Sequence, residues 1–210
     1  MRVRITFAKT EPMRYTGHLD LHRTWERTLR RANLPLSYSQ GFKPHPRIVL
    51  ACALPLGCTS QKELVDIWLD EQIAAEQIMD SIKVAAPPGL EILQVAEADP
   101  DLPALPTQVQ ASEYQIILRD PIPDLDEALQ RLIAAGTLPR IWRDKAYDLR
   151  PLILQIERLA DDLDGCQQIK VVLSAREAAT GRPEEVLHLL GIEPGEARIQ
   201  RTRLIFQNAN

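Results

Sequence analysis

The segment at residues 34–47, LPLSYSQGFKPHPR, places aromatic rings next to positive charges. Tyr38 and Phe42 offer ring faces on which nucleic-acid bases can stack, while Lys43 and Arg47 offer cations for phosphates. Stretches of this length between a helix and a strand often carry function in compact domains. The segment therefore predicts a loop that binds single-stranded RNA. The alternative is a packed surface loop whose rings cap the core.

The same segment contains the best candidate for acid–base chemistry. His45 stands between Pro44 and Pro46, which restrict its backbone, and the nearby cations disfavour its protonated form. An imidazole in such a setting is suited to act as a general acid or base. Gln40 adds hydrogen-bonding groups and Gly41 permits a turn. No nucleophile–base pair or phosphate-binding loop accompanies His45, so the residues define no fuller mechanism.

The segment follows a stretch, residues 17–33, with the period of an amphipathic helix. Its apolar face is predicted to pack on a sheet and its basic face to point outward. The apolar residues are Leu21, Trp25, Leu29 and Ala32. The basic residues are Arg23, Arg27, Arg30 and, beside them, Arg31. We expect this arginine face to lead into the loop and to recruit RNA or an acidic partner. The alternative is a solvated face, with the last arginines favoured by the helix dipole.

The charge of the chain is unevenly distributed. Ten of the first fifty residues are Lys or Arg and three are Asp or Glu, whereas the other 160 residues carry 15 basic and 26 acidic groups. The net charge of −4 hides this contrast. A basic block on an acidic protein predicts a surface that meets a polyanion or an acidic protein.

Metal binding is weakly supported. His18 and His22 are four residues apart, but no third ligand accompanies them, and His18 falls on the apolar side of the predicted helix, where a buried histidine is expected. Asp20 lies in the first helical turn, where a carboxylate is favourable without catalysis. Cys52, Cys58 and Cys166 lack ligand spacing and are expected to be buried thiols. We therefore expect neither a metal nor a cofactor in this chain.

Periodicity predicts an α+β fold made of two similar halves. In the first half, strands are expected at 2–9, 47–54, 63–70 and 90–97, and helices at 17–33 and 74–85. This βαββαβ order is that of a ferredoxin-like unit with an antiparallel sheet. In the second half, strands are expected at 114–119, 150–157 and 168–175 and in the last segment around 201–203, with helices at 124–135 and 183–190.

A shift of 106 positions carries Pro88-Gly89 onto Pro194-Gly195 and aligns the central strands of the two halves. This favours a tandem duplication: a first ferredoxin-like unit at 1–98, a Pro-rich extended linker at 99–112, and a second unit at 113–210. The alternative is one α+β domain with a coincidental Pro-Gly pair.

Two further segments of the second half contain charged residues in defined settings. Asp148 and Arg150 lie in YDLRPL, where they are expected to alternate outward from an extended segment, and Gly181-Arg182-Pro183 is expected at the start of a helix. Structural pairing is the favoured interpretation of these residues.

Much of the sequence resembles a bacterial family of uncharacterised, radical-SAM-linked proteins, a domain of unknown function found alone or fused behind B12-binding radical SAM enzymes. The specific matches are HLDL at residues 18–21 and SQGFKPHP at 39–46, with weaker ones in YDLRPLI, GRP and RTRL. The family pattern corresponds here to His18, Asp20, Gln40, Gly41, Phe42, His45, Pro46, Asp148 and Arg150.

The resemblance implies an association with radical SAM chemistry rather than a known reaction. This chain has no Cys-x-x-x-Cys-x-x-Cys, so no iron–sulfur cluster of that kind is expected in it, and a radical SAM enzyme would be a partner in trans. The expected architecture is also similar to the repeat-processing endoribonucleases of CRISPR systems. The glycine-rich loop of those enzymes is matched here only by Gly191 and Gly195.

Three functions follow from these patterns: an RNA-binding accessory protein, an adaptor that docks an acidic protein, and an RNA-processing enzyme that uses His45. No apolar run approaches the ~18 residues of a membrane span, and the first residues lack the apolar core of a signal peptide. A cytoplasmic protein without a membrane partner is expected.

Overall fold

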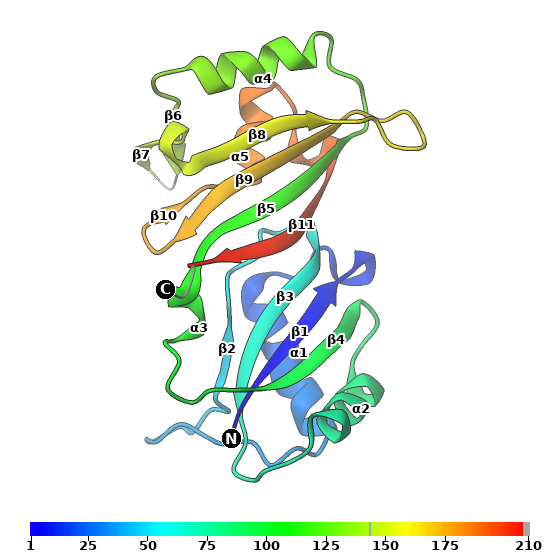
Figure 1. Ribbon diagram of the computed structural model, residues 1–210, viewed down its shortest axis with the longest axis vertical. Coiled ribbons are helices and arrows are strands. Elements are labelled where there is room, and N and C mark those ends of the chain that lie inside the picture. The colour runs from blue at the N-terminus through cyan, green and yellow to red at the C-terminus, as the bar shows by residue number, and fades with distance from the viewer. Residues whose placement is uncertain (143, 208–210) are drawn as a thin grey trace. The chain divides into compact units, whose positions relative to one another are not determined.

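The computed structural model describes residues 1–142 and 144–207, and it divides into two compact units, Met1–Val109 and Gln110–Asn210. Each unit combines a few helices with strands that pair in an antiparallel manner (Figure 1). The predicted α+β class with antiparallel strands is therefore confirmed. No helix in the described residues is long and apolar enough to cross a membrane.

The first unit has the element order β-α-β-β-α-β. Its main elements are β1 (Arg2–Lys9), α1 (His18–Arg31), β2 (Ile48–Leu50), β3 (Cys58–Trp68), α2 (Ala75–Ala85) and β4 (Leu90–Ala98). The strand order across its sheet is β2-β3-β1-β4 (Figure 1). A short 3-10 helix, η1 (Glu11–Met13), precedes α1, and the four-residue helix α3 (Leu105–Gln108) follows β4.

Alternation along β1 decides which face of this sheet meets the helices. Val3, Ile5 and Phe7 are fully buried in one core with residues of α1 and α2. The ring of Phe7 meets the ring of Trp25 edge to face, with centroids 4.9 Å apart. Because successive side chains of a strand point to opposite faces, Arg2 and Arg4 lie on the other face.

That other face is organised by Asp66, which is 0% exposed. Arg2, itself 2% exposed, donates to Asp66 Oδ2 from Nε at 3.0 Å and from Nη2 at 2.6 Å. Arg4 stands directly opposite Asp66 in the β1–β3 register and donates from Nε to Oδ1 at 2.8 Å. Arg2 also donates to the carbonyls of Leu102, at 2.7 Å, and Pro103, at 3.0 Å. One buried carboxylate thus joins two strands to the segment that follows β4.

The second unit also combines helices with antiparallel strands. Its elements are β5 (Val109–Leu118), α4 (Leu125–Ala134), β6 (Pro139–Trp142), β7 (Lys145–Asp148), the 3-10 helix η2 (Arg150–Leu152), β8 (Ile153–Leu159), β9 (Gln168–Arg176), β10 (Ala179–Thr180), α5 (Pro183–Leu189), the 3-10 helix η3 (Pro194–Glu196) and β11 (Ala197–Phe206). The strand order across its sheet is β8-β9-β5-β11, with β10 also paired to β9. Strands β6 and β7 form a separate hairpin (Figure 1).

Several predicted elements differ in extent. The strand expected at 47–54 is short, at Ile48–Leu50, while the strand expected at 63–70 begins earlier, at Cys58. The extended linker expected at 99–112 is partly wrong, because its second half contains α3 and the start of β5. Leu105 and Val109 in that half are buried, which explains why it folds rather than staying solvated.

The two Pro-Gly pairs have different conformations. Gly89 has a φ of +91°, and a Cβ there would lie 2.8 Å from Met13 Cγ and 2.9 Å from Met13 N, so only glycine fits. Gly195 lies in η3, and a Cβ there would meet nothing within 4 Å. The two pairs match in sequence, but only Gly89 has a backbone conformation and a close contact that require glycine.

Replacing Asp66 by Ala should lower the free energy of unfolding by about 3–5 kcal/mol, because two guanidinium groups lose their counter-charge and one of them is buried. Urea denaturation measures the change. Asp80→Ala, at an exposed position of α2, is the control and should stay within about 0.5 kcal/mol of the parent protein. Equal stability of the two variants would contradict the central role of Asp66.

Candidate nucleic-acid interface

The segment between α1 and β2 is held by its own backbone hydrogen bonds. Ser39 N donates to His45 O at 2.8 Å, and His45 N donates back to Ser39 Oγ at 3.0 Å. Arg47 N donates to Ser37 O at 2.9 Å, and Tyr38 forms an isolated β-bridge with Pro46. Residues 37–39 and 45–47 therefore form a paired frame that closes a tip at residues 40–44.

The tip presents side chains to solvent. Phe42 is 109% exposed and Tyr38 is 43% exposed, although aromatic rings ordinarily bury much of their surface. Gly41 has a φ of +133°, which lets the chain turn at the tip. Gln40 and Lys43 are also exposed. The predicted rings and cations thus share one exposed segment, whose role in binding stays a prediction.

The base of the frame is tied to the end of β3. Ser37 N donates to Trp68 O at 2.8 Å, and Trp68 N donates to Arg47 O at 3.2 Å. The guanidinium of Arg47 lies over the Trp68 ring, 4.5 Å from its centroid. This cation–π contact orients Arg47 while leaving the residue exposed. The sequence analysis did not pick out Trp68, because only the β2–β3 pairing brings it beside Arg47.

His45 is exposed in this frame. Its backbone takes part in the pairing with Ser39, while its imidazole makes no hydrogen bond or ion pair with any described residue. Pro46, the neighbouring residue of the family pattern, is buried and anchors the frame. No nucleophile is positioned against His45 by these contacts, so its catalytic role stays a prediction.

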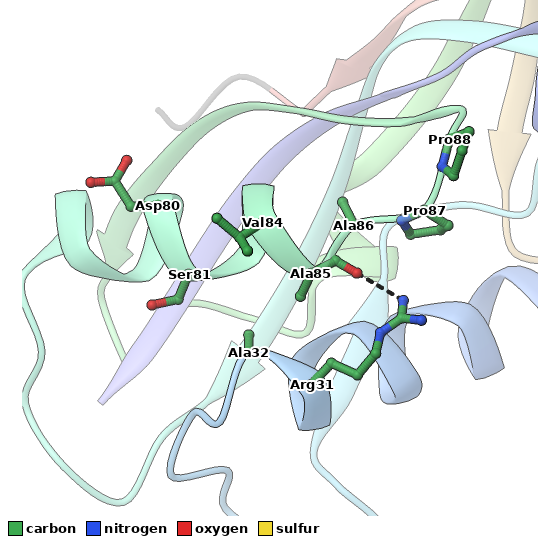
Figure 2. A pocket seen from close by; sticks show the side chains of 9 residues that line it. All are labelled: Arg31, Ala32, Asp80, Ser81, Val84, Ala85, Ala86, Pro87 and Pro88. Atoms are coloured by element: carbon green, nitrogen blue, oxygen red, sulfur yellow. Dashed lines mark hydrogen bonds between the residues drawn. The ribbon is translucent and has the colours of Figure 1, made fainter.

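Two of the four arginines on the basic face of α1 have partners within the protein. Arg23 pairs with Asp20 at 3.0 Å, and Arg31 donates to the Ala85 carbonyl at the end of α2 at 2.8 Å. Figure 2 shows Arg31 reaching from α1 to this carbonyl beside an open surface hollow. Arg27 and Arg30 are exposed and make no hydrogen bond or ion pair among the described residues. They are the arginines of this face that remain available to a ligand.

Several of the ten basic residues among the first fifty do not face outward. Arg2, Lys9 and Arg14 are buried, and Arg4 is paired with Asp66. Lys9 Nζ donates to the carbonyls of Arg14, at 3.2 Å, and Thr16, at 3.0 Å. These cations stabilise the fold of the first unit and do not add to an outward positive surface.

The histidines of α1 differ from their predicted settings. His18 is the first residue of the helix and is exposed, so the expectation of a buried histidine is wrong. Helical side chains tilt toward the N-terminus, which at the first position directs them past the end of the helix rather than onto the sheet. His22 lies 3.3 Å from Ile48 O through Nε2 and 3.6 Å from Glu26 Oε1 through Nδ1.

Asp148 and Arg150, the two residues of the family pattern in the second unit, form hydrogen bonds with backbone groups. Asp148 Oδ1 accepts from Leu138 N at 2.7 Å and from Arg150 N at 2.9 Å. The Arg150 guanidinium donates to Ile133 O near the end of α4, at 3.0 Å from Nη2, and to Ile153 O at 3.2 Å. Both residues therefore fix the turn between β7 and β8, and they are half-buried rather than directed outward.

The cysteines and acidic residues provide no metal centre in residues 1–142 and 144–207. No group of three or more His, Cys, Asp or Glu side chains there is placed to hold an ion. The three cysteines form no disulfide with one another; Cys58 is buried as expected, whereas Cys52 and Cys166 are half-buried.

A family model matches residues 2–183. The chain belongs to DUF2344, a family described as uncharacterized proteins conserved in bacteria. A comparison with curated proteins finds no match. The family assignment confirms the expected uncharacterised bacterial family, but it shows no radical SAM association and attaches no reaction to the chain.

Solved structures match this chain at low sequence identity. One match is a chain in the crystal structure of a Cbf5-Nop10-Gar1 complex, with 13% identity, a TM-score of 0.52, and coverage of 99% of this chain and 50% of that one. A second is in an archaeal box H/ACA sRNP Nop10-Cbf5 complex, with 14% identity, a TM-score of 0.48, and coverage of 99% and 49%. The first likeness shows a related fold alone. This chain spans about half the length of those chains.

Asp148→Ala should destabilise the protein by about 1–3 kcal/mol, because two backbone N–H groups lose their acceptor. Asp148→Asn, which keeps an acceptor oxygen, should cost less. Thermal or urea unfolding measures both, with the exposed Asp120→Ala as the control. An unchanged stability of Asp148→Ala would argue against this structural role.

Proposed function

We propose that the protein is an RNA-binding accessory protein, with the frame and tip at residues 37–47 as its recognition surface. The observation that supports it is the fully exposed Phe42 on a hydrogen-bonded frame that also carries Tyr38 and the oriented Arg47. Exposed rings next to cations suit unpaired bases and their phosphates. Arg27 and Arg30 on α1 add cations that are not neutralised within the described residues.

A radical SAM enzyme is the proposed partner in trans, on the basis of the sequence resemblance. In this arrangement the protein would hold RNA and the enzyme would modify it. The alternative function is an adaptor, in which the same exposed cations dock an acidic protein such as that enzyme. The two functions differ in their ligand. In the first, RNA binds this surface; in the second, an acidic protein binds it and RNA does not compete.

The two units are proposed to be copies of one ferredoxin-like unit. What supports this is the common strand order, β2-β3-β1-β4 in the first unit and β8-β9-β5-β11 in the second. Both orders place the second strand at one edge and the fourth at the other, as a split βαβ arrangement requires. The predicted boundaries, 1–98 and 113–210, assign the first four residues of β5 to the linker, so the second copy is proposed to begin with β5 at Val109.

Affinity for a single-stranded RNA oligonucleotide should fall steeply with salt. Each phosphate neutralised contributes about −0.7 to the slope of log K against log salt concentration for single strands. The double variant Arg27→Gln/Arg30→Gln should therefore make the slope shallower by about 1.4. Fluorescence anisotropy at several salt concentrations measures this. Binding that is absent at low salt, or independent of salt, excludes the RNA proposal.

Phe42→Ala should weaken RNA binding by about 1–3 kcal/mol, the usual contribution of one base stacked on an aromatic ring. Its stability should stay within about 0.5 kcal/mol of the parent, because the ring is fully exposed. Leu163→Ala provides the matched control, since Leu163 in the second unit is 106% exposed. Equal RNA affinity of the two variants would remove Phe42 from the recognition surface.

Two further variants separate the alternatives. Charge reversal, Arg27→Glu/Arg30→Glu, should abolish capture of a purified radical SAM enzyme if the adaptor function holds, and added RNA should then not compete. His45→Ala tests the enzymatic alternative: RNA cleavage by the parent that is lost in this variant would support it, and cleavage that persists would exclude His45.

A further inference from the structure

The second unit contains a cavity that the proposed RNA surface does not use. Its volume is about 410 Å³, within the ~300–1,000 Å³ typical of small-molecule sites. The β6–β7 hairpin contributes Trp142, Lys145 and Tyr147 to the wall, and β10 contributes Thr180. Arg182 closes the cavity from the start of α5.

Gly181 lets the turn between β10 and α5 pack closely against β9 and η2. A Cβ at Gly181 would lie 3.1 Å from Leu173 Cβ and 3.3 Å from Leu152 Cβ, so a larger residue would push the segment outward. Gly181 N donates to Ser174 O at 2.8 Å, and Pro183 begins α5 in a buried position. The Gly181-Arg182-Pro183 motif thus serves to project Arg182 from a tightly packed turn.

Arg182 is held in position by the hairpin. Its guanidinium carbon lies 3.8 Å from the centroid of the Trp142 ring, a cation–π contact. Burial, and then the charge of Glu185, raises the pKa of Tyr147, whose hydroxyl is protonated at neutral pH as in an ordinary tyrosine. The wall therefore combines a planar cation, a second ring and a neutral hydroxyl.

The two cations that line the cavity have no carboxylate paired with them among the described residues. Glu185 forms an ion pair with Arg140, which does not line the cavity. Lys145 and Arg182 form no ion pair with a carboxylate in the described residues. Glu184 is the nearest carboxylate to Arg182 in sequence; burial raises its pKa, while the charge of Arg182 acts to lower it. A ligand with about two negative charges would complete the electrostatics of the cavity.

We propose that this cavity binds a nucleoside 5′-phosphate, with the phosphate between Lys145 and Arg182 and the base against the aromatic wall. A phosphate monoester carries about −1.5 to −2 charges at pH 7, which matches two cations better than a single carboxylate does. The nucleotide is either free or the 5′-phosphorylated end of an RNA chain, since both present the same groups. The assignment is independent of the RNA surface in the first unit.

Isothermal titration of the 210-residue chain with adenosine and uridine 5′-monophosphate tests the proposal. Lys145→Gln and Arg182→Gln should each weaken binding roughly tenfold or more, through loss of a charge-assisted hydrogen bond. Lys83→Gln and Arg119→Gln, at exposed positions outside the cavity, should bind as the parent does. Lys145 is itself exposed, so its variant should fold even if Arg182→Gln does not.

Uridine and inorganic phosphate, titrated separately, should bind far more weakly than the nucleotide. A 5′-phosphorylated RNA trinucleotide distinguishes the two sources: tighter binding than the mononucleotide indicates an RNA end, and weaker binding a free nucleotide. No binding of either ligand by the parent protein would overturn the proposal. Unchanged affinity in both cavity variants, or inorganic phosphate binding as tightly as the nucleotide, would overturn it as well.

Discussion

The buried carboxylate of Asp66 is the constraint on which the first unit depends. It lies between Arg2 and Arg4 on the face of the sheet opposite the helices, and neither Asp66 nor Arg2 reaches solvent to an appreciable extent. A one-residue slip of β1 against β3 would turn these charges toward the apolar core, so the ion pairs and the core select the same register. Arg2 also lies 5.3 Å from the Trp68 ring centroid, and Trp68 is the residue against which the loop frame is built.

The sequence predicted the elements of the fold better than the surface of the site. Alternation in residues 2–9 and helical periodicity in 17–33 follow from burial, and the structure has β1 at Arg2–Lys9 and α1 at His18–Arg31. The count of basic residues was misleading, since Arg2 and Lys9 satisfy internal partners. Composition does not distinguish such buried cations from exposed ones, because their partners come from strands and turns distant in sequence.

Long-range pairing also explains what the sequence missed in the second unit. Strands β6, at residues 139–142, and β7, at residues 145–148, have mostly exposed side chains with little alternation to indicate strands. Asp148 stood out as a charged residue, but its acceptor role toward Leu138 N depends on that hairpin. The cavity residues Trp142 and Arg182 are forty positions apart and become neighbours only through the folded chain. No pattern in the local sequence predicts such a contact.

The frame at residues 37–39 and 45–47 has its hydrogen bonds in place without a ligand, and this has a thermodynamic consequence. Segments that fold on binding bury large apolar areas and give a correspondingly large negative change in heat capacity. Here Ser39, His45 and Arg47 already have their backbone partners, and Pro46 is already buried. The heat capacity change of association should therefore reflect only the covering of the tip rings, and little conformational entropy should be lost when they are covered.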